Sequence, residues 1–154
     1  MSDNEEKPMS EAPEPAARPR LLIVDDALIM RMRIAAIARE SGWEVVGEAD
    51  DGGQGIDRYR ELRPDLVTLD LVMPHVDGVE TLRTIMAADP RARVVMVSAV
   101  DQRAKLMECI ELGAVDFVVK PFDRSRLGAL FTKYATVTAR SGLEPPQPPA
   151  PDDS

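Results

Sequence analysis

The sequence predicts a doubly wound α/β fold built on a five-stranded parallel sheet. Two observations carry this prediction: short apolar runs recur along the chain, and a segment with helical spacing of apolar residues follows each run. Runs of this length that are rich in β-branched residues are typical of strands covered on both faces, as in parallel sheets. Five strand–helix units with short connections therefore favour helices packed on both sides of one sheet.

Each element follows from a local pattern. Four apolar strands are predicted at 21–24, 66–69, 94–97 and 115–119, and the mixed segment 43–49 suits an edge strand. Apolar stripes predict helices at 28–40 and 54–62, and around 79–86, 106–112 and 127–134. Pro64, Pro90 and Gly113 stand where the second, third and fourth helices should end. The glycine-rich residues 52–55 are predicted to form a flexible turn that opens the second helix.

Proline and charge divide the chain into a body and two tails. Nine of the 13 prolines lie within residues 1–20 or 141–154, and these segments carry −5 of the formal net charge of −8. Segments so polar and proline-rich bury too little apolar surface to fold. We therefore predict disordered tails at 1–19 and 140–154, around one folded domain at 20–139 that is long enough to bury a core.

Composition also excludes several classes of function. A weakly acidic body with acidic tails argues against nucleic-acid binding, which needs clustered Lys and Arg. No apolar run approaches the roughly 18 residues of a membrane span, and residues 1–20 lack the pattern of a signal peptide, so no membrane insertion is expected. The single cysteine, Cys109, excludes an internal disulfide, and the expected location is a reducing cytoplasm.

Polar side chains stand where the predicted strands end. The first strand is followed by a pair of acids, and three later strands end in one polar residue each: Asp25, Asp26, Asp70, Ser98 and Lys120. Taken singly, such residues are usually helix caps, turn residues or solvated ends. In an open α/β sheet, however, the carboxyl ends of the strands form the ligand-binding edge. Three carboxylates gathered there would repel one another unless a cation neutralised them.

These groups suit metal-dependent transfer of a phosphoryl group to a carboxylate. Mg²⁺ prefers oxygen ligands and keeps some of its waters, so one to three carboxylates suffice to hold it. An aspartate can be the in-line nucleophile and become an acyl phosphate. Asp70 is the best candidate because it is central, which leaves Asp25 and Asp26 for the metal. Lys120 would then pair with one phosphoryl oxygen, and Ser98 would hydrogen-bond another.

The order and spacing of these residues resemble one family closely. The body resembles the response-regulator receiver domain, the CheY-like fold, through Asp25-Asp26, Asp70-Leu71-Val72-Met73-Pro74, Asp77-Gly78, Ser98-Ala99 and Lys120-Pro121-Phe122. The resemblance covers about residues 20–139 and implies a flavodoxin-like sheet with strand order 2-1-3-4-5. It also implies a stand-alone regulator of bacterial two-component signalling, of the chemotaxis type. Such a chain is no enzyme beyond catalysing its own phosphorylation and autodephosphorylation.

The resemblance also implies roles for single residues. Asp70 would accept the phosphoryl group from a phosphohistidine of a sensor histidine kinase or a histidine phosphotransfer protein. Mg²⁺ would be held by Asp25, Asp26, Asp70 and the backbone carbonyl of Val72. Lys120 would contact the phosphoryl group, and its bond to the following proline is expected to be cis.

A conformational switch is implied by two further positions. Ser98 would move toward the phosphate, and Phe117 would turn into the space that Ser98 leaves. Phe117 carries no hydroxyl where many members carry Tyr, so a hydrogen bond from this ring to a partner is excluded. The face formed by the fourth helix, fifth strand and fifth helix would contact an unidentified target protein. That face lacks the cross-pairing charges of the dimerising transcription-factor subfamily, which favours heterologous contacts.

Two valines predict a long-lived aspartyl phosphate. In the resembled family, the positions two residues beyond Asp70 and Ser98 flank the hydrolytic water, and here they are Val72 and Val100. Valine cannot hydrogen-bond that water and partly excludes it. We therefore expect slow hydrolysis of the acyl phosphate.

Three alternatives remain at this point. The chain could be a phosphorelay intermediate that passes phosphate to a histidine phosphotransfer protein, or the receiver part of a longer regulator whose proline-rich end is a linker. A phosphatase of the haloacid-dehalogenase type is the alternative from another class. Such enzymes need a second acid two residues after the nucleophile, and Val72 stands at that position.

Overall fold

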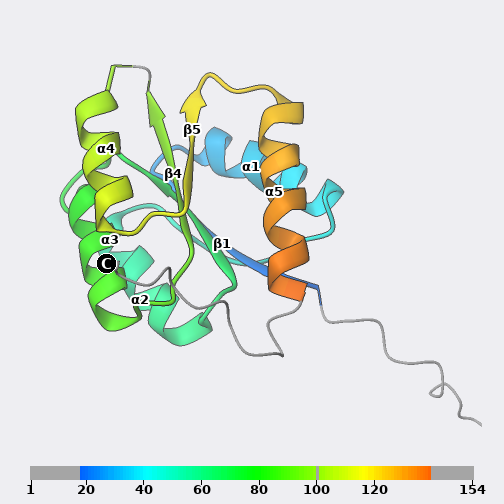
Figure 1. Ribbon diagram of the computed structural model, residues 1–154, viewed down its shortest axis with the longest axis horizontal. Coiled ribbons are helices and arrows are strands. Elements are labelled where there is room, and N and C mark those ends of the chain that lie inside the picture. The colour runs from blue at the N-terminus through cyan, green and yellow to red at the C-terminus, as the bar shows by residue number, and fades with distance from the viewer. Residues whose placement is uncertain (1–17, 100, 140–154) are drawn as a thin grey trace, which may run out of the picture.

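The computed structural model describes residues 18–99 and 101–139, which form one parallel sheet between two layers of helices (Figure 1). The sheet has the order β2-β1-β3-β4-β5, as predicted. Its strands are β1 (Arg20–Val24), β2 (Glu44–Ala49), β3 (Leu66–Asp70), β4 (Val94–Ala99) and β5 (Asp116–Lys120). Most of the first predicted tail and all of the second lie outside the described residues.

Five helices cover the two faces of this sheet. They are α1 (Leu28–Glu40), α2 (Gly52–Leu62), α3 (Gly78–Ala88), α4 (Arg103–Leu112) and α5 (Arg124–Ala139). In Figure 1, α1 and α5 lie together on one side of the sheet, and α2, α3 and α4 lie on the other. None of the helices in the described part of the chain is long and apolar enough to cross a membrane.

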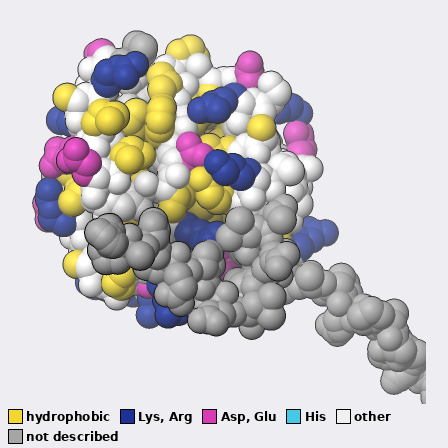
Figure 2. Space-filling model, in the orientation of Figure 1, with side chains coloured by type: hydrophobic (Ala, Val, Ile, Leu, Met, Phe, Trp, Pro, Cys, Tyr) yellow, Lys and Arg dark blue, Asp and Glu magenta, His cyan; other side chains and the backbone are white. Residues whose placement is uncertain are grey.

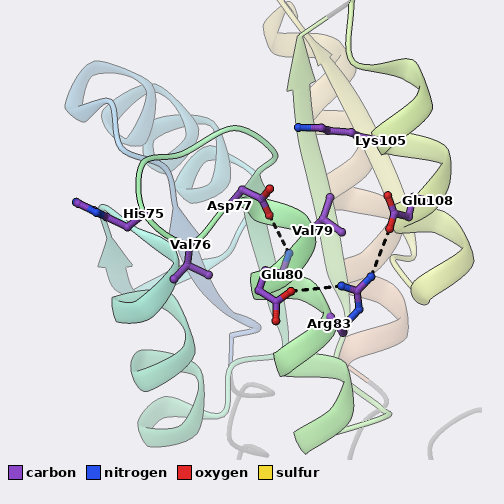
Figure 3. A pocket seen from close by; sticks show the side chains of 8 residues that line it. All are labelled: His75, Val76, Asp77, Val79, Glu80, Arg83, Lys105 and Glu108. Atoms are coloured by element: carbon purple, nitrogen blue, oxygen red, sulfur yellow. Dashed lines mark hydrogen bonds and ion pairs between the residues drawn. The ribbon is translucent and has the colours of Figure 1, made fainter.

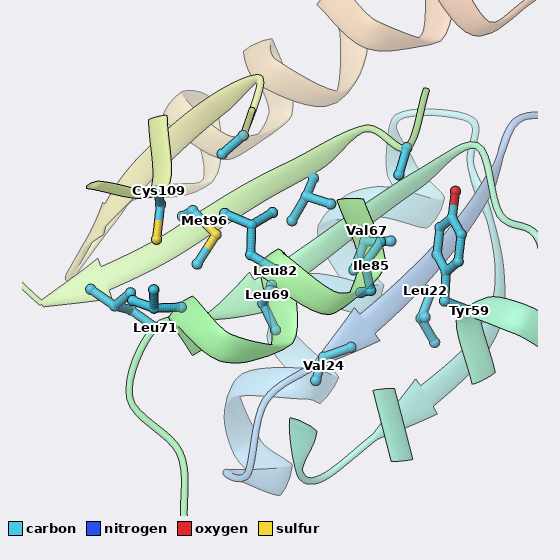
Figure 4. Close-up of a cluster of buried hydrophobic side chains, with 14 of the residues drawn as sticks. Leu22, Val24, Tyr59, Val67, Leu69, Leu71, Leu82, Ile85, Met96 and Cys109 are labelled. Atoms are coloured by element: carbon cyan, nitrogen blue, oxygen red, sulfur yellow. The ribbon is translucent and has the colours of Figure 1, made fainter. Parts of the chain in front are cut away.

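The wholly apolar strands are explained by two separate cores. Successive side chains of a strand point to opposite faces, so Leu22 and Val24 pack toward α2, α3 and α4 (Figure 4), whereas Leu21 and Ile23 pack toward α1 and α5. All four are almost fully buried. Burying one such side chain contributes about 1.5–3 kcal/mol, so the central strands hold both helical layers in place.

Several predicted boundaries differ from the structure, and two of these differences are informative. β5 begins at Asp116 rather than Val115, whose side chain is 38% exposed. α2 begins at Gly52, so residues 52–55 form the first turn of the helix rather than a flexible turn before it. A Cβ at Gly52 would lie 2.6 Å from the carbonyl oxygen of Val76. Glycine therefore lets α2 approach the segment before α3 closely, a tertiary reason that the local sequence does not reveal.

Candidate functional site

Three carboxylates meet at the carboxyl edge of the sheet. Asp25 and Asp26 directly follow β1, and Asp70 is the last residue of the neighbouring strand β3. One oxygen from each of these three side chains lies within 4.8 Å of the others. Asp25 and Asp70 are buried, and Asp26 is exposed on the open side of the cluster. The structure thus brings together the acids that the sequence singled out.

The carboxylate of Asp25 is held at both oxygens. Its Oδ1 accepts a hydrogen bond from the backbone N–H of Ala27 at 2.9 Å, and its Oδ2 lies 3.4 Å from the Nζ of Lys120. Ala27 is the N-cap of α1 and has no side-chain cap of its own. Asp25 therefore fixes both the entry to α1 and its own orientation in the cluster.

Lys120 is the cation of this site. Its Nζ lies 3.4 Å from a carboxylate oxygen of Asp25 and equally 3.4 Å from Oδ1 of Asp70. One ammonium thus pairs with both of the buried carboxylates in the cluster of three acids. Burial raises the pKa of Asp70 to about 6; the charge of Asp25 adds to this rise, and Lys120 opposes it.

The donor set fits a hard divalent cation. Three clustered carboxylates supply only oxygen ligands, which Mg²⁺ prefers, and the exposure of Asp26 leaves room for waters. Burial is the main cause of the raised pKa of Asp70, and the negative charge of Asp25 raises it further despite the nearby Lys120. A bound dication would neutralise that charge.

Three of the remaining predicted residues lie on β4, on β5 or just after β3. Ser98 is buried at the end of β4, and its hydroxyl donates to the carbonyl of Ala99 at 2.9 Å, so its proton is not directed at Asp70. Phe117 is partly buried against the core beneath α2, α3 and α4. Val72 lies just beyond Asp70 and is 52% exposed. Val100 lies outside the described residues.

Two backbone features shape the loops at this edge. The peptide bond between Lys120 and Pro121 is cis, as expected from the resemblance. Gly78 packs its backbone against the end of β3, where a Cβ would lie 2.5 Å from the carbonyl oxygen of Asp70. Its N–H donates to the carbonyl of Leu71 at 2.9 Å. Only glycine fits this approach, which folds the β3–α3 loop back beside the acidic cluster.

A separate hollow of about 450 Å³ lies between α3 and α4, away from the acidic cluster (Figure 3). Arg83 of α3 spans it by pairing with Glu80 and with Glu108 of α4, each at 3.3 Å. Both of its glutamates already pair with Arg83, and Asp25, Asp26 and Asp70 do not line it. The chemistry indicated by burial and charge therefore belongs to the sheet edge rather than to this hollow.

Two residues of α1 that the sequence did not single out contact the loops of this site. Arg31 donates from Nη1 to the carbonyl of Asp25 at 2.7 Å, and Arg33 donates from Nη2 to the carbonyl of Phe122 at 2.7 Å. A bond from a side chain to a distant backbone carbonyl leaves no motif in the sequence. Only the folded chain reveals it.

Comparison with known proteins supports the same family throughout the body. The model of the response regulator receiver domain matches residues 21–132. The chain is 46% identical over 116 residues to "Chemotaxis protein CheY" of Thermotoga maritima, covering 75% of this chain and 97% of that protein. It is 49% identical over 116 residues to "Chemotaxis protein CheY" of Listeria monocytogenes, covering 75% of this chain and 98% of that one.

A solved structure agrees with this result. A chain of the CheX-CheY-BeF3-Mg²⁺ complex from Borrelia burgdorferi superimposes with a TM-score of 0.68 at 35% identity, covering 71% of this chain and 83% of that chain. The family match spans all five strands and the acidic edge between them. The chain belongs to the response regulator receiver domain family.

Proposed function

We propose that this chain is a stand-alone receiver of two-component signalling that accepts a phosphoryl group on Asp70 and signals through a phosphorylation-dependent contact with another protein. One observation carries the proposal: Asp70 is a buried carboxylate next to two further acids, with Lys120 beside it at 3.4 Å. The relatives named for chemotaxis support a role of that type.

The proposed reaction forms one bond and breaks one. A carboxylate oxygen of Asp70 attacks the phosphorus of a phosphohistidine, and the phosphorus–nitrogen bond to the donor imidazole breaks. The imidazole leaves with that electron pair and takes up a proton. Mg²⁺ bound by Asp25, Asp26, Asp70 and the Val72 carbonyl would neutralise charge on the phosphoryl oxygens. Lys120 would pair with another of these oxygens and so orient the group.

The surface around the cluster suits a docked donor protein. Four of the exposed large hydrophobic residues in the described chain lie beside the acids, on the first turns of α1 and just after β3: Leu28, Ile29, Met32 and Val72. Exposed apolar side chains gathered around a polar site are typical of a protein contact. They support a sensor histidine kinase or a histidine phosphotransfer protein as the donor.

The face of α4, β5 and α5 would carry the output. Hydrophobic side chains gather over α4 and β5 in Figure 2, and Met107 and Val115 are 52% and 38% exposed there. Phe117 of β5 lies between this face and the core, and Ser98 lies on the adjacent strand. A hydroxyl of Ser98 turned toward a phosphoryl group would free space for the Phe117 ring, and the change would reach this face.

Phosphotransfer profiling tests the proposal. The purified chain is incubated with labelled phosphohistidine donors and Mg²⁺, beside Asp70→Asn and the matched variant Asp51→Asn. Asp51 is also an aspartate but caps α2, a role that Asn fills equally well. We expect label on the wild type and on Asp51→Asn, and none on Asp70→Asn. Label retained by Asp70→Asn would refute the assignment of the acceptor.

Decay of the labelled protein tests the predicted lifetime. If Val72 and Val100 restrict the hydrolytic water, the double variant Val72→Asn, Val100→Glu should lose its label faster than the wild type in Mg²⁺. Equal decay rates would show that these side chains do not control hydrolysis.

A further inference from the structure

Helix α1 contacts both loops that carry the charged groups of the acidic edge. From the geometry we infer that Arg31 and Arg33 are positioning residues: Arg31 fixes the loop that bears Asp25 and Asp26, and Arg33 fixes the loop that follows Lys120. This inference rests on the proposed function, because it assigns the two arginines to the metal and phosphoryl parts of that site. Neither guanidinium is proposed to touch the metal or the phosphoryl group.

Arg31 joins the first loop to the edge of the sheet. Its Nη1 donates to the carbonyl of Asp25 at 2.7 Å, and its Nε pairs with Glu48 of β2 at 2.9 Å. The side chain of Arg31 is only 15% exposed, whereas that of Glu48 is 40% exposed, so the bond to the Asp25 carbonyl is the better shielded of the two contacts. The planar guanidinium of Arg31 bonds two acceptors at once. It therefore restricts the backbone of the loop that carries both proposed metal ligands, Asp25 and Asp26.

The other bonds of the first loop act on other atoms of Asp25, whose carboxylate is held by the amide of Ala27 and by Lys120. Ala27 provides no side-chain cap for α1, and the amide of Asp25 is bonded to the carbonyl of Ala49 at 3.0 Å. Arg31 is therefore the side chain that donates a hydrogen bond to the backbone carbonyl of Asp25. Without it, that carbonyl loses its partner and Glu48 loses its cation.

Arg33 acts on the opposite loop. Its Nη2 donates to the carbonyl of Phe122 at 2.7 Å, and its guanidinium carbon lies 5.1 Å from the centre of the Phe122 ring. Phe122 is buried and stands two residues after Lys120. A guanidinium that both bonds the carbonyl and stacks on the ring restrains this loop, and with it the place of the Lys120 ammonium.

The charge of Arg31 and its positioning role predict opposite changes in Mg²⁺ affinity when the residue is replaced, which makes the inference testable. Removing a positive charge near a dication site should tighten Mg²⁺ binding by Coulomb's law alone. Loss of a group that orients metal ligands should weaken it, by about tenfold in comparable sites. We therefore expect Arg31→Met to bind Mg²⁺ about tenfold more weakly, measured by calorimetry on the full chain without a phosphodonor.

Arg33 requires a variant that keeps its charge. Arg33→Lys retains the cation but cannot make the hydrogen bond and the stacking contact together. We expect Arg33→Lys to bind Mg²⁺ as the wild type does. Its affinity for beryllofluoride, a phosphoryl mimic, should fall by about three- to tenfold at saturating Mg²⁺, measured by fluorine NMR. A general loss of stability would not lower the affinity for beryllofluoride while leaving the affinity for Mg²⁺ unchanged.

Arg39→Met is the matched control, because Arg39 lies in the last turn of α1 and is exposed. It should change neither affinity. If Arg31→Met binds Mg²⁺ as tightly as Arg39→Met or more tightly, or if Arg33→Lys binds beryllofluoride normally, the inference is wrong while the proposed function stands. If the wild type binds neither Mg²⁺ nor beryllofluoride, the proposed function fails, and the inference fails with it.

Discussion

The two ends of the sheet treat their charged residues in opposite ways. At the carboxyl edge, the two buried carboxylates in a cluster of three acids share one lysine, and the pKa of Asp70 rises to about 6. At the amino edge, the acids are individually matched. Asp65 accepts the backbone N–H of Arg20 at 2.9 Å, and Asp89 receives the hydroxyl of Tyr59 at 2.6 Å and Arg63 at 3.1 Å.

This difference distinguishes a functional site at the carboxyl edge from a structural contact at the amino edge. Matched polar groups stabilise the fold because each buried donor and acceptor has its partner. Clustered like charges cost stability when no ligand is bound, and such perturbed groups are typical of functional sites. The amino edge thus stabilises the sheet. The carboxyl edge keeps clustered negative charge, which a bound cation, or a phosphoryl group together with its cation, can neutralise.

Removal of Lys120 should give the largest effect on stability. Lys120→Met leaves the buried carboxylates of Asp25 and Asp70 without a cation, and we expect a loss of about 2–3 kcal/mol in the free energy of unfolding, measured with urea at pH 8 in EDTA. Lys105→Met removes an exposed lysine of α4 and should stay within about 0.5 kcal/mol. Equal effects of the two variants would mean that Lys120 stabilises the carboxyl edge no more than an exposed lysine does.

Asp70→Asn should stabilise the metal-free protein while it abolishes phosphoryl uptake. Asn keeps the shape of the side chain but removes one charge from the cluster, and we expect a gain of about 1–2 kcal/mol at pH 8 in EDTA. Asp51→Asn serves again as the control and should show no gain. A loss of stability in Asp70→Asn would mean that Lys120 already balances this edge.

The gain from Asp70→Asn should depend on pH. The folded protein keeps the proton of Asp70 up to a pKa of about 6, whereas the ordinary pKa of an aspartate is 3.8, so unfolding releases a proton between these values. The contribution of Asp70 to stability therefore falls as pH rises through this window and is constant above it. The difference between wild type and variant should be near zero below pH 3.8 and complete above about 6. A constant difference across this range would contradict the raised pKa.

The smallest effect is expected at the amino edge. Tyr59→Phe removes the hydrogen bond to Asp89, which keeps its ion pair with Arg63, and should cost about 1 kcal/mol. Because this contact lies at the far end of the sheet, saturating Mg²⁺ should not change the cost, measured by urea unfolding. A cost of Tyr59→Phe that varied with Mg²⁺ would show that the two ends are coupled.

The sequence predicted the fold and the acidic edge because both depend on regular patterns. Apolar runs such as 21–24 specify strands that are covered on both faces, and a parallel sheet necessarily brings their carboxyl ends together. The convergence of Asp25, Asp26 and Asp70 follows from that topology. The strand order came from the resemblance to the receiver family, since periodicity alone does not order parallel strands.

Other features depend on contacts that no local pattern records. The start of α2 at Gly52 reflects its close approach to Val76, and glycines in sequence look like a turn. The hydroxyl of Ser98 bonds the neighbouring carbonyl, a choice between two acceptors that the residue type leaves open. Arg31 and Arg33 were missed because side chains of an exposed helical surface usually signal solvation.

The single tryptophan gives the chain its own optical reporter of folding. Trp43 is fully buried beside Phe131, with ring centroids 5.8 Å apart, and its indole N–H donates to the carbonyl of Phe131 at 3.0 Å. Its fluorescence therefore monitors the docking of α5 on the sheet. Unfolding of every variant above can be followed through this intrinsic emission, without a dye or an added label.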